Sequence, residues 1–170
     1  TEGWRVYHKD LNGGTSSYGW YVNLNNTNAE AEQGNIWGLS NPPDETTVVV
    51  LQPYFGGAGD YLLLLFSSVD GISKVGSYSG SNDAQTITTG FQPRFVIIRS
   101  TDEANWVVLD TTRGWASGVD QYLKLNSSAA QDNTYDCGAP TSTGFTVSAA
   151  SANSGLTNTA GLDFIYYAHA

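Results

Sequence analysis

The feature that most constrains this chain is a series of short runs rich in Val, Ile, Thr, Tyr and Trp, each bounded by Gly, Asn, Asp, Ser or Pro. Such runs are typical of β-strands separated by turns. They occupy residues 4–8, 19–24, 46–51, 61–66, 85–89, 94–100, 105–110, 122–125, 145–149 and 163–170. The best helix candidate, residues 27–33, is very short. The sequence therefore predicts an all-β fold of the β-sandwich or jelly-roll kind.

The chain also repeats itself. The segment YVNLNNTNAE at residues 21–30 matches YLKLNSSAAQ at residues 122–131. Trp4 matches Trp106 upstream of these segments, and Asp60 matches Asp163 downstream. Because these anchors are in the same order at nearly constant separation, we predict two related halves of about 100 residues. We place them at residues 1–76 and 77–170, and we expect them to share one core.

The second half begins with a leader, residues 73–105, that has no counterpart in the first half. We therefore expect the native polypeptide to extend upstream of Thr1. In the folded state, the leader strands that the first half lacks would be replaced by strands of another subunit. The alternative is a chain that was cut at a convenient boundary. The apolar run at residues 61–66 has the length of a strand, and its continuous apolarity predicts cover on both faces.

The composition excludes several classes of partner. The chain carries 7 basic and 16 acidic residues, a net charge of −9, which disfavours binding to nucleic acid or to an anionic membrane surface. No apolar run approaches the length of a membrane helix. Cys137 is the single cysteine, so no disulfide can form within the chain, and a cytosolic origin or assembly fits best.

Motifs for catalysis or for cofactors are missing from the sequence. His8 and His169 are far apart, no metal-ligand spacing occurs, and no nucleotide-binding loop precedes a helix. Cys137 is best interpreted as a small buried thiol. We interpret the acidic turns at residues 81–85 and 100–105 as solvated turns rather than weak Ca²⁺ sites. We expect no enzyme activity, no metal and no cofactor, although sixteen carboxylates leave a polysaccharide-cleaving pair as an alternative.

The aromatic residues divide into two groups. Those that recur in both halves we assign to the core, namely Trp4 with Trp106, Tyr21 with Tyr122, and Tyr61 with Phe164. Others have no partner in the repeat, and these are the candidate binding or interface residues Trp20, Trp37, Tyr54, Phe55 and Trp115. Exposed aromatic rings beside polar residues stack on sugar rings or form subunit interfaces. Local packing is the alternative for each of them.

The ordered motifs resemble a known family. WRVYHKDL, the following YxxLN, GDYLLLLFSSVDGISKVGSYSG, TGFQPRFVIIRSTDEANWVVLDTTRG and YLKLNSSAA together resemble a domain of unknown function in virion proteins of tailed, mostly marine, bacteriophages. In such proteins the domain often lies in the C-terminal part of a tail fibre or another exposed structural protein. The resemblance implies a location on the virion, on the exterior of the phage tail or capsid, and it brings no catalytic residues.

We therefore predict a non-enzymatic structural and binding domain of a tail fibre or receptor-binding protein. Its expected partners are other virion proteins, further copies of itself in a homotrimer, and a host surface glycan. Fibres of tailed phages are commonly trimeric, so the trimer is carried over from the resemblance. A capsid decoration or head-fibre protein, a polysaccharide-degrading enzyme and a cellular carbohydrate-binding module are the alternatives.

Overall fold

The computed structural model describes residues 3–34, 36–38, 43–44, 46–49 and 60–170. In this part of the chain the protein consists of antiparallel β-sheets with almost no helix. The helical elements are one α-helical turn, α1 (Ala150–Asn153), and two 3-10 turns, η1 (Leu11–Gly14) and η2 (Ser17–Gly19). The all-β prediction is confirmed at this level.

The described residues form three antiparallel sheets. The first contains, in spatial order, β1 (Arg5–Val6), β2 (Trp20–Asn23) and β3 (Ala31–Glu32). The second contains β5 (Gln85–Thr88), β10 (Gly144–Val147) and β9 (Pro140–Thr141). The third is five-stranded and contains β4 (Ser73–Ser79), β11 (Asp163–His169), β6 (Phe95–Ser100), β7 (Val107–Asp110) and β8 (Tyr122–Lys124).

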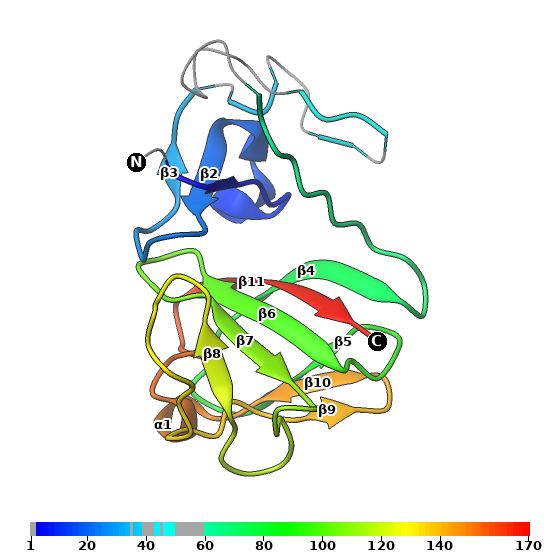
Figure 1. Ribbon diagram of the computed structural model, residues 1–170, viewed down its shortest axis with the longest axis vertical. Helices are drawn as coiled ribbons and strands as arrows, with labels where there is room; N and C mark the ends of the chain where they lie inside the picture. The colour runs from blue at the N-terminus through cyan, green and yellow to red at the C-terminus, as the bar shows by residue number, and fades with distance from the viewer. Residues whose placement is uncertain (1–2, 35, 39–42, 45, 50–59) are drawn as a thin grey trace.

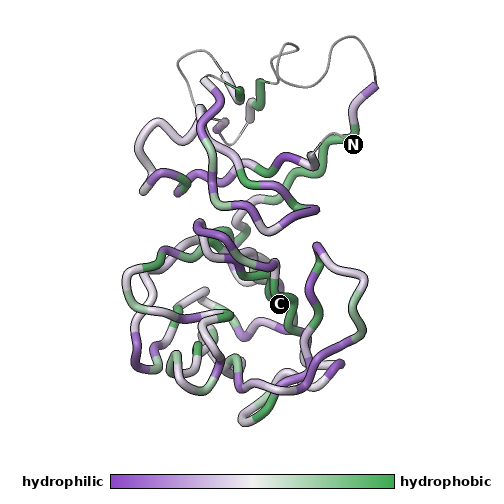
Figure 2. The backbone as a smooth tube through the Cα atoms, turned by 90° about the vertical axis from the view of Figure 1, so that its left-hand side faces the viewer, coloured by the Kyte–Doolittle hydropathy of each residue, from purple (hydrophilic) through white to green (hydrophobic). Residues whose placement is uncertain are grey.

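The sheets are stacked in tiers, with the five-stranded sheet in the middle (Figure 1). The β1–β2–β3 unit lies above it, and β5, β9, β10 and α1 lie below it. A view from the side shows the same separation into an upper unit and a larger lower body (Figure 2). The predicted boundary at residue 76 falls inside β4, which belongs to the middle sheet.

The two faces of the middle sheet bury two separate clusters of side chains. Alternation along a strand sends successive side chains to opposite faces. On the lower face, Val96 and Ile98 of β6 join a large cluster with Trp115, Phe145 and Phe164. The upper face contributes to a smaller cluster, which consists of Leu11, Val22, Trp106 and Ile165 with Val6, Trp20, Leu24 and Ile97 packed against it. The upper unit is therefore docked on the sheet by apolar contact.

A buried arginine also joins the upper unit to the sheet. Arg99 of β6 is fully buried, and its guanidinium donates to the backbone carbonyls of Asn23 (2.7 Å) and Asn28. It lies over the ring of Trp106, 5.3 Å from the centroid. Trp106 Nε1 donates to the same Asn23 carbonyl at 2.8 Å. Burial lowers the pKa of Arg99 to about 10, so the group stays charged at neutral pH. The carbonyl dipoles thus replace the water that this cation loses.

Most predicted strands of the second half are confirmed, but several predictions for the first half are wrong. The predicted helix at residues 27–33 is not formed, because Ala31 and Glu32 pair as β3 with Tyr21 and Trp20 of β2. Residues 46–49 form no strand, and residues 50–51 lie outside the described residues. The strand pattern does not predict β4, because its sequence SKVGSYS is polar and rich in Ser and Gly.

The apolar run at residues 61–66 is the largest disagreement with the sequence prediction. The prediction of a strand covered on both faces is wrong, since the run is exposed and forms no strand. The assignment of Trp4 and Tyr61 to the core is also wrong, since both are exposed, whereas Trp106, Tyr122 and Phe164 are buried as predicted. Trp106 is buried because it packs in the upper cluster, and Phe164 is buried because it lies in β11 and joins the lower cluster, whereas neither Trp4 nor Tyr61 belongs to a buried cluster.

Candidate functional site

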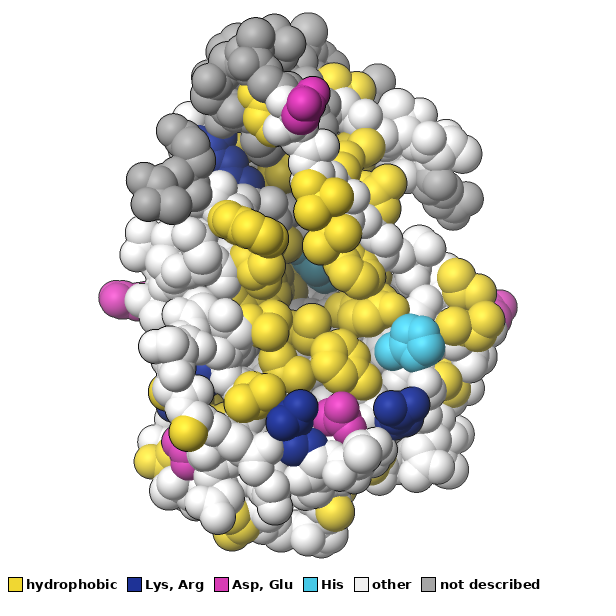
Figure 3. Space-filling model, viewed as in Figure 1, with side chains coloured by type: hydrophobic (Ala, Val, Ile, Leu, Met, Phe, Trp, Pro, Cys, Tyr) yellow, Lys and Arg dark blue, Asp and Glu magenta, His cyan; other side chains and the backbone are white. Residues whose placement is uncertain are grey.

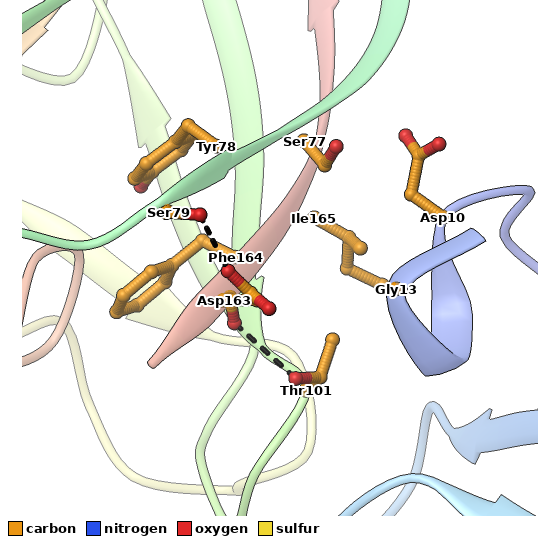
Figure 4. A pocket seen from close by; sticks show the side chains of 9 residues that line it. All are labelled: Asp10, Gly13, Ser77, Tyr78, Ser79, Thr101, Asp163, Phe164 and Ile165. Atoms are coloured by element: carbon orange, nitrogen blue, oxygen red, sulfur yellow. Dashed lines mark hydrogen bonds between the residues drawn. The ribbon is translucent and has the colours of Figure 1, made fainter. Parts of the chain in front are cut away.

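A polar cavity of about 450 Å³ lies where the upper unit meets the edge of the middle sheet. Asp10 and Gly13 approach it from the η1 region, and the opposite wall is built by β4, β11 and Thr101 (Figure 4). Ser79 Oγ donates a 2.7 Å hydrogen bond to Asp163, which fixes that carboxylate at the rim. The backbone N–H of Thr101 donates to the Asp163 carbonyl at 2.9 Å. The cavity therefore combines carboxylates and hydroxyls from segments that are distant in sequence.

Two aromatic residues, Tyr78 and Phe164, also line the cavity, but their rings lie on the other side of the β4–β11 ribbon from Asp10 and Ile165 (Figure 4). Tyr78 and Phe164 stack with ring centroids 5.2 Å apart and planes 6° apart. The Tyr78 hydroxyl donates to the Thr157 carbonyl at 2.6 Å, and burial raises its pKa, so it remains protonated. Lys9 Nζ donates to both carboxylate oxygens of Asp10 at 2.8 Å, so this lining carboxylate is paired with a cation.

A second hollow of about 320 Å³ lies at the end of β11. It is lined by Arg94, Phe95, Asp110, Tyr167, His169 and Ala170. The rings of Tyr167 and His169 are 6.3 Å apart, and Phe66 packs against Tyr167 at 4.9 Å. Basic, acidic and histidine side chains border the hydrophobic area in this part of the face in Figure 3. Aromatic rings can stack on a sugar ring, and a guanidinium such as that of Arg94 and a carboxylate such as that of Asp110 can form hydrogen bonds with sugar hydroxyls.

The apolar segment (residues 62–66) is a third surface feature. Its side chains, four leucines and Phe66, are all exposed. Within the described part of the chain, these residues form no backbone hydrogen bond with another segment. The segment runs beside the upper unit on its way to β4 (Figure 1). Its side chains join a hydrophobic area in the middle of the face shown in Figure 3. Exposed apolar patches of this kind mark surfaces that bind another polypeptide or a ligand.

The candidate residues from the sequence do not form one site. Trp37 is buried and donates from Nε1 to the carbonyl of Trp20 at 2.9 Å, while Trp20 packs against the upper cluster. Trp115 is buried in the lower cluster, far from this pair, with its ring 6.1 Å from that of Phe145. Local packing, the alternative considered for each tryptophan, accounts for Trp37 and Trp115.

Two of the predicted site residues cannot be placed. Tyr54 and Phe55 lie outside the described residues, so their prediction as binding residues stays a prediction. Sequence reasoning missed the residues of the polar cavity, because Asp10, Ser79 and Asp163 come from segments with no common spacing in the sequence. The sequence singles out Asp163 only as an anchor of the repeat.

The single thiol lies in the interior. Cys137 is fully buried, and burial together with Asp120 and Asp136 raises its pKa, so it stays a thiol. Its backbone N–H donates to Asp120 at 2.7 Å, and the same carboxylate accepts from the N–H of Ala116 at 3.0 Å. Burial raises the pKa of Asp120 to about 6. These groups fix the loop that carries Trp115 into the core, and they have no access to a substrate.

Neither a metal site nor a membrane helix is present in the described ranges. No three His, Cys, Asp or Glu side chains come together there as a group able to hold a metal ion. None of the helices in those ranges is long and apolar enough to cross a membrane. His8 is buried with its Nδ1 accepting from the N–H of Asp10 at 3.2 Å, whereas His169 is exposed at the second hollow.

The fold and surface define a class of small antiparallel β-protein with polar and aromatic surface hollows beside an exposed apolar segment. The chain belongs to the family described as a domain of unknown function, DUF7483, whose model matches residues 1–170. No curated protein and no solved structure matches the chain.

Proposed function

We propose that this domain is a non-enzymatic structural and binding part of a tailed-phage virion, a tail-fibre or receptor-binding component. Its work is association with neighbouring virion subunits. The observation that carries this proposal is the apolar segment, because five consecutive exposed apolar side chains are costly in a solitary domain and useful in an assembled one. The resemblance of the ordered motifs to virion proteins gives the proposal its biological setting.

The location is tested on assembled particles. Antibody against residues 1–170 is applied to purified phage and followed by electron microscopy, and cross-linking with mass spectrometry identifies the neighbours. Label on the tail fibres supports the proposal, whereas label on the capsid supports the decoration or head-fibre alternative. Absence of the protein from purified particles overturns both. Light scattering on the purified chain measures whether it forms the expected homotrimer.

A glycan ligand is a second candidate function, favoured by the hollow that contains Phe95, Tyr167 and His169 beside Arg94 and Asp110. A glycan array measures binding, and Tyr167→Ala is expected to abolish it by removing the stacking surface. Trp4→Ala removes another exposed ring and is the matched control. A reducing-sugar assay on host capsule or lipopolysaccharide distinguishes binding from the polysaccharide-degrading alternative.

We also propose that the chain is built from two related halves of sandwich-like sheets. Support comes from strand register, because β1 pairs with β2 with Val6 opposite Val22, and β7 pairs with β8 with Val108 opposite Leu123. These two pairs occupy equivalent positions of the sequence repeat. The next bridge agrees as well, since Tyr21 lies opposite Ala31 and Tyr122 lies opposite Asp132.

Hydrogen bonds around the two hairpins also correspond. The N–H of Trp4 donates to Asn25 Oδ1 at 3.0 Å, and that of Trp106 donates to Asn126 Oδ1 at 2.9 Å. The Trp4 carbonyl accepts from the N–H of Leu24 at 2.7 Å. In the same way, the Trp106 carbonyl accepts from the N–H at residue 125 at 3.0 Å. This agreement in hydrogen bonding and register supports a duplicated hairpin. Asn25→Ala and Asn126→Ala are expected to loosen their own hairpins, as measured by amide hydrogen exchange.

A further inference from the structure

One end of the middle sheet carries a row of three side chains from three neighbouring strands. His169 of β11 lies opposite Phe95 of β6, and Phe95 lies opposite Asp110 of β7. Residues that lie opposite each other in an antiparallel pair point to the same face of the sheet. Tyr167 points to this face as well, because it is two residues before His169 on β11. These four side chains therefore form one surface, and all of them line the second hollow.

The upper unit covers only part of this face of the sheet. Ile165, two residues before Tyr167 on β11, is buried in the upper cluster. Tyr167 is half-buried, and His169 is exposed at the C-terminal end of β11 (Figure 1). The row therefore lies where the face is open to solvent. It extends over roughly 10 Å, twice the spacing between neighbouring strands, which is the length of two linked pyranose rings.

Hydrogen bonds fix the backbone from which the polar groups of the hollow project. The N–H of Arg94 donates to the His169 carbonyl at 2.8 Å, and the Arg94 carbonyl accepts from the N–H of Thr111 at 2.9 Å. The Oδ1 atom of Asp110 accepts from the N–H of Thr112 at 2.7 Å. Because these positions are held before any ligand arrives, little backbone entropy is lost when one binds.

The polar groups of the hollow include more hydrogen-bond acceptors than donors. Nδ1 of His169 lies 2.8 Å from the backbone oxygen of Ala170, which can only accept, so Nδ1 carries the proton and Nε2 of the neutral ring is an acceptor. Oδ2 of Asp110 is a second acceptor, and the guanidinium of Arg94 is a donor. Within the described part of the chain no hydrogen bond or ion pair engages this guanidinium, so it is available to a ligand.

We propose that the second hollow binds a neutral glycan through a disaccharide unit, with one sugar ring on Tyr167 and the next on Phe95. This inference rests on the glycan-binding function proposed above. Hydroxyl groups of the sugars donate to Asp110 and to Nε2 of His169, and they accept from Arg94. The site selects uncharged hexoses over uronic and sialic acids.

The charges of the hollow and of the chain favour a neutral ligand over an acidic one. Arg94 and Asp110 cancel within the hollow, and the whole chain carries a net charge of −9. An acidic polysaccharide is therefore repelled as it approaches. A carboxylate also has no proton to donate, so at this position it would leave Asp110 and Nε2 of His169 without a partner. A hydroxyl group both donates and accepts, so hydroxyls satisfy all three groups.

The test measures binding of the purified complete chain to sugars in three arms of a glycan array. The arms are disaccharides of glucose, galactose and mannose, the same disaccharides with one hexose replaced by its uronic acid, and the monosaccharides. We expect a neutral disaccharide to bind, and its uronic acid counterpart and its monosaccharide to bind at least about tenfold more weakly. Because the ligand carries no charge, calorimetric titration at about 50 and about 500 mM NaCl should give Kd values that agree within about twofold.

Variants locate the binding site. Arg94→Gln removes the charged donor at an exposed position and is expected to weaken binding of the neutral disaccharide at least about tenfold. Arg113→Gln changes an exposed arginine outside the hollow and is the matched control, expected to leave Kd unchanged. Asp110→Asn keeps an acceptor for the N–H of Thr112 but removes the negative charge. It is expected to reduce the preference for the neutral over the acidic disaccharide by about fivefold.

Two results overturn the proposal and leave glycan binding in place. One is tightest binding by an acidic sugar with an affinity that falls as salt is added. The other is a neutral ligand whose Kd changes no more in Arg94→Gln than in Arg113→Gln, which would place the site elsewhere. If no sugar binds in any arm, the glycan-binding function fails and this proposal fails with it. The location of the protein on the virion is measured separately and is unaffected by these results.

Discussion

Replacing Arg99 by Met removes a fully buried charge from the joint between the upper unit and the middle sheet while keeping an unbranched side chain. The variant no longer donates to the carbonyls of Asn23 and Asn28, and a hydrogen bond from a charged donor contributes about 1.5–3 kcal/mol. The Asn23 carbonyl keeps its bond from Trp106 Nε1, and the Asn28 side of the joint lies near solvent. For the two lost hydrogen bonds together we therefore expect the lower end of their combined contribution, a decrease of about 3 kcal/mol in the free energy of unfolding.

Urea denaturation followed by tryptophan fluorescence measures this decrease, and thermal melting measures it independently. For a chain of this size about 3 kcal/mol corresponds to a fall of roughly 6–12 °C in Tm. Arg113→Met is the matched control, since Arg113 is exposed and the one hydrogen bond of its guanidinium within the described residues goes to Gln131 at 3.2 Å, and we expect a change below about 0.5 kcal/mol. If Arg99→Met were no more destabilising than Arg113→Met, the joint would depend on apolar contact alone and the role of the buried arginine would be refuted.

Three further predictions concern stability. Burial lowers the pKa of His8 to about 4, so the stability that the neutral side chain contributes is complete above pH 6.5 and is lost as the pH falls towards 4. The difference in unfolding free energy between the wild type and His8→Gln should therefore shrink by about 3 kcal/mol over that interval. A difference that does not depend on pH contradicts the assignment. Trp115→Ala should cost about 3–5 kcal/mol by leaving a cavity in the lower cluster, whereas Trp4→Ala should cost under about 0.5 kcal/mol, and equal melting temperatures for the two variants would refute the burial pattern. Leu63→Asp should change the melting temperature of the free chain by less than about 2 °C, because this part of the apolar segment lies at the surface, and a large decrease would show that it is covered.

The strands of the second half were predictable because each one is a β-rich run that ends at turn residues, and because its partners follow within the same chain. The run FVII of β6 alternates between two buried clusters, so both of its faces are apolar, as the sequence indicated. The apolar segment has an equally strong pattern. Its pattern failed because apolarity predicts burial only when a partner strand is present, and none is supplied by the described residues.

The candidate site was less predictable than the fold. Trp37 and Trp115 were singled out because neither has a partner in the repeat. The loops that carry them nevertheless place both indole rings in the interior. For Trp115, a turn that closes with its N–H donating to the Asp110 carbonyl at 3.0 Å directs the indole into the lower cluster. The polar cavity depends on Asp10 meeting Asp163 across two tiers of the fold. Such a meeting is a property of tertiary packing, and no local spacing in the sequence encodes it.

The interior position of Cys137 has a consequence for the durability of the domain. These 170 residues contain no methionine, and their one sulfur atom belongs to a fully buried side chain. An oxidant therefore meets no accessible thiol or thioether in this part of the polypeptide, and it can form neither a sulfoxide nor a disulfide crosslink between copies while the fold is intact. The folded domain therefore keeps the same covalent structure at sulfur in a reducing medium and in an oxidising one. Transfer of the protein from one medium to the other changes nothing at this sulfur atom.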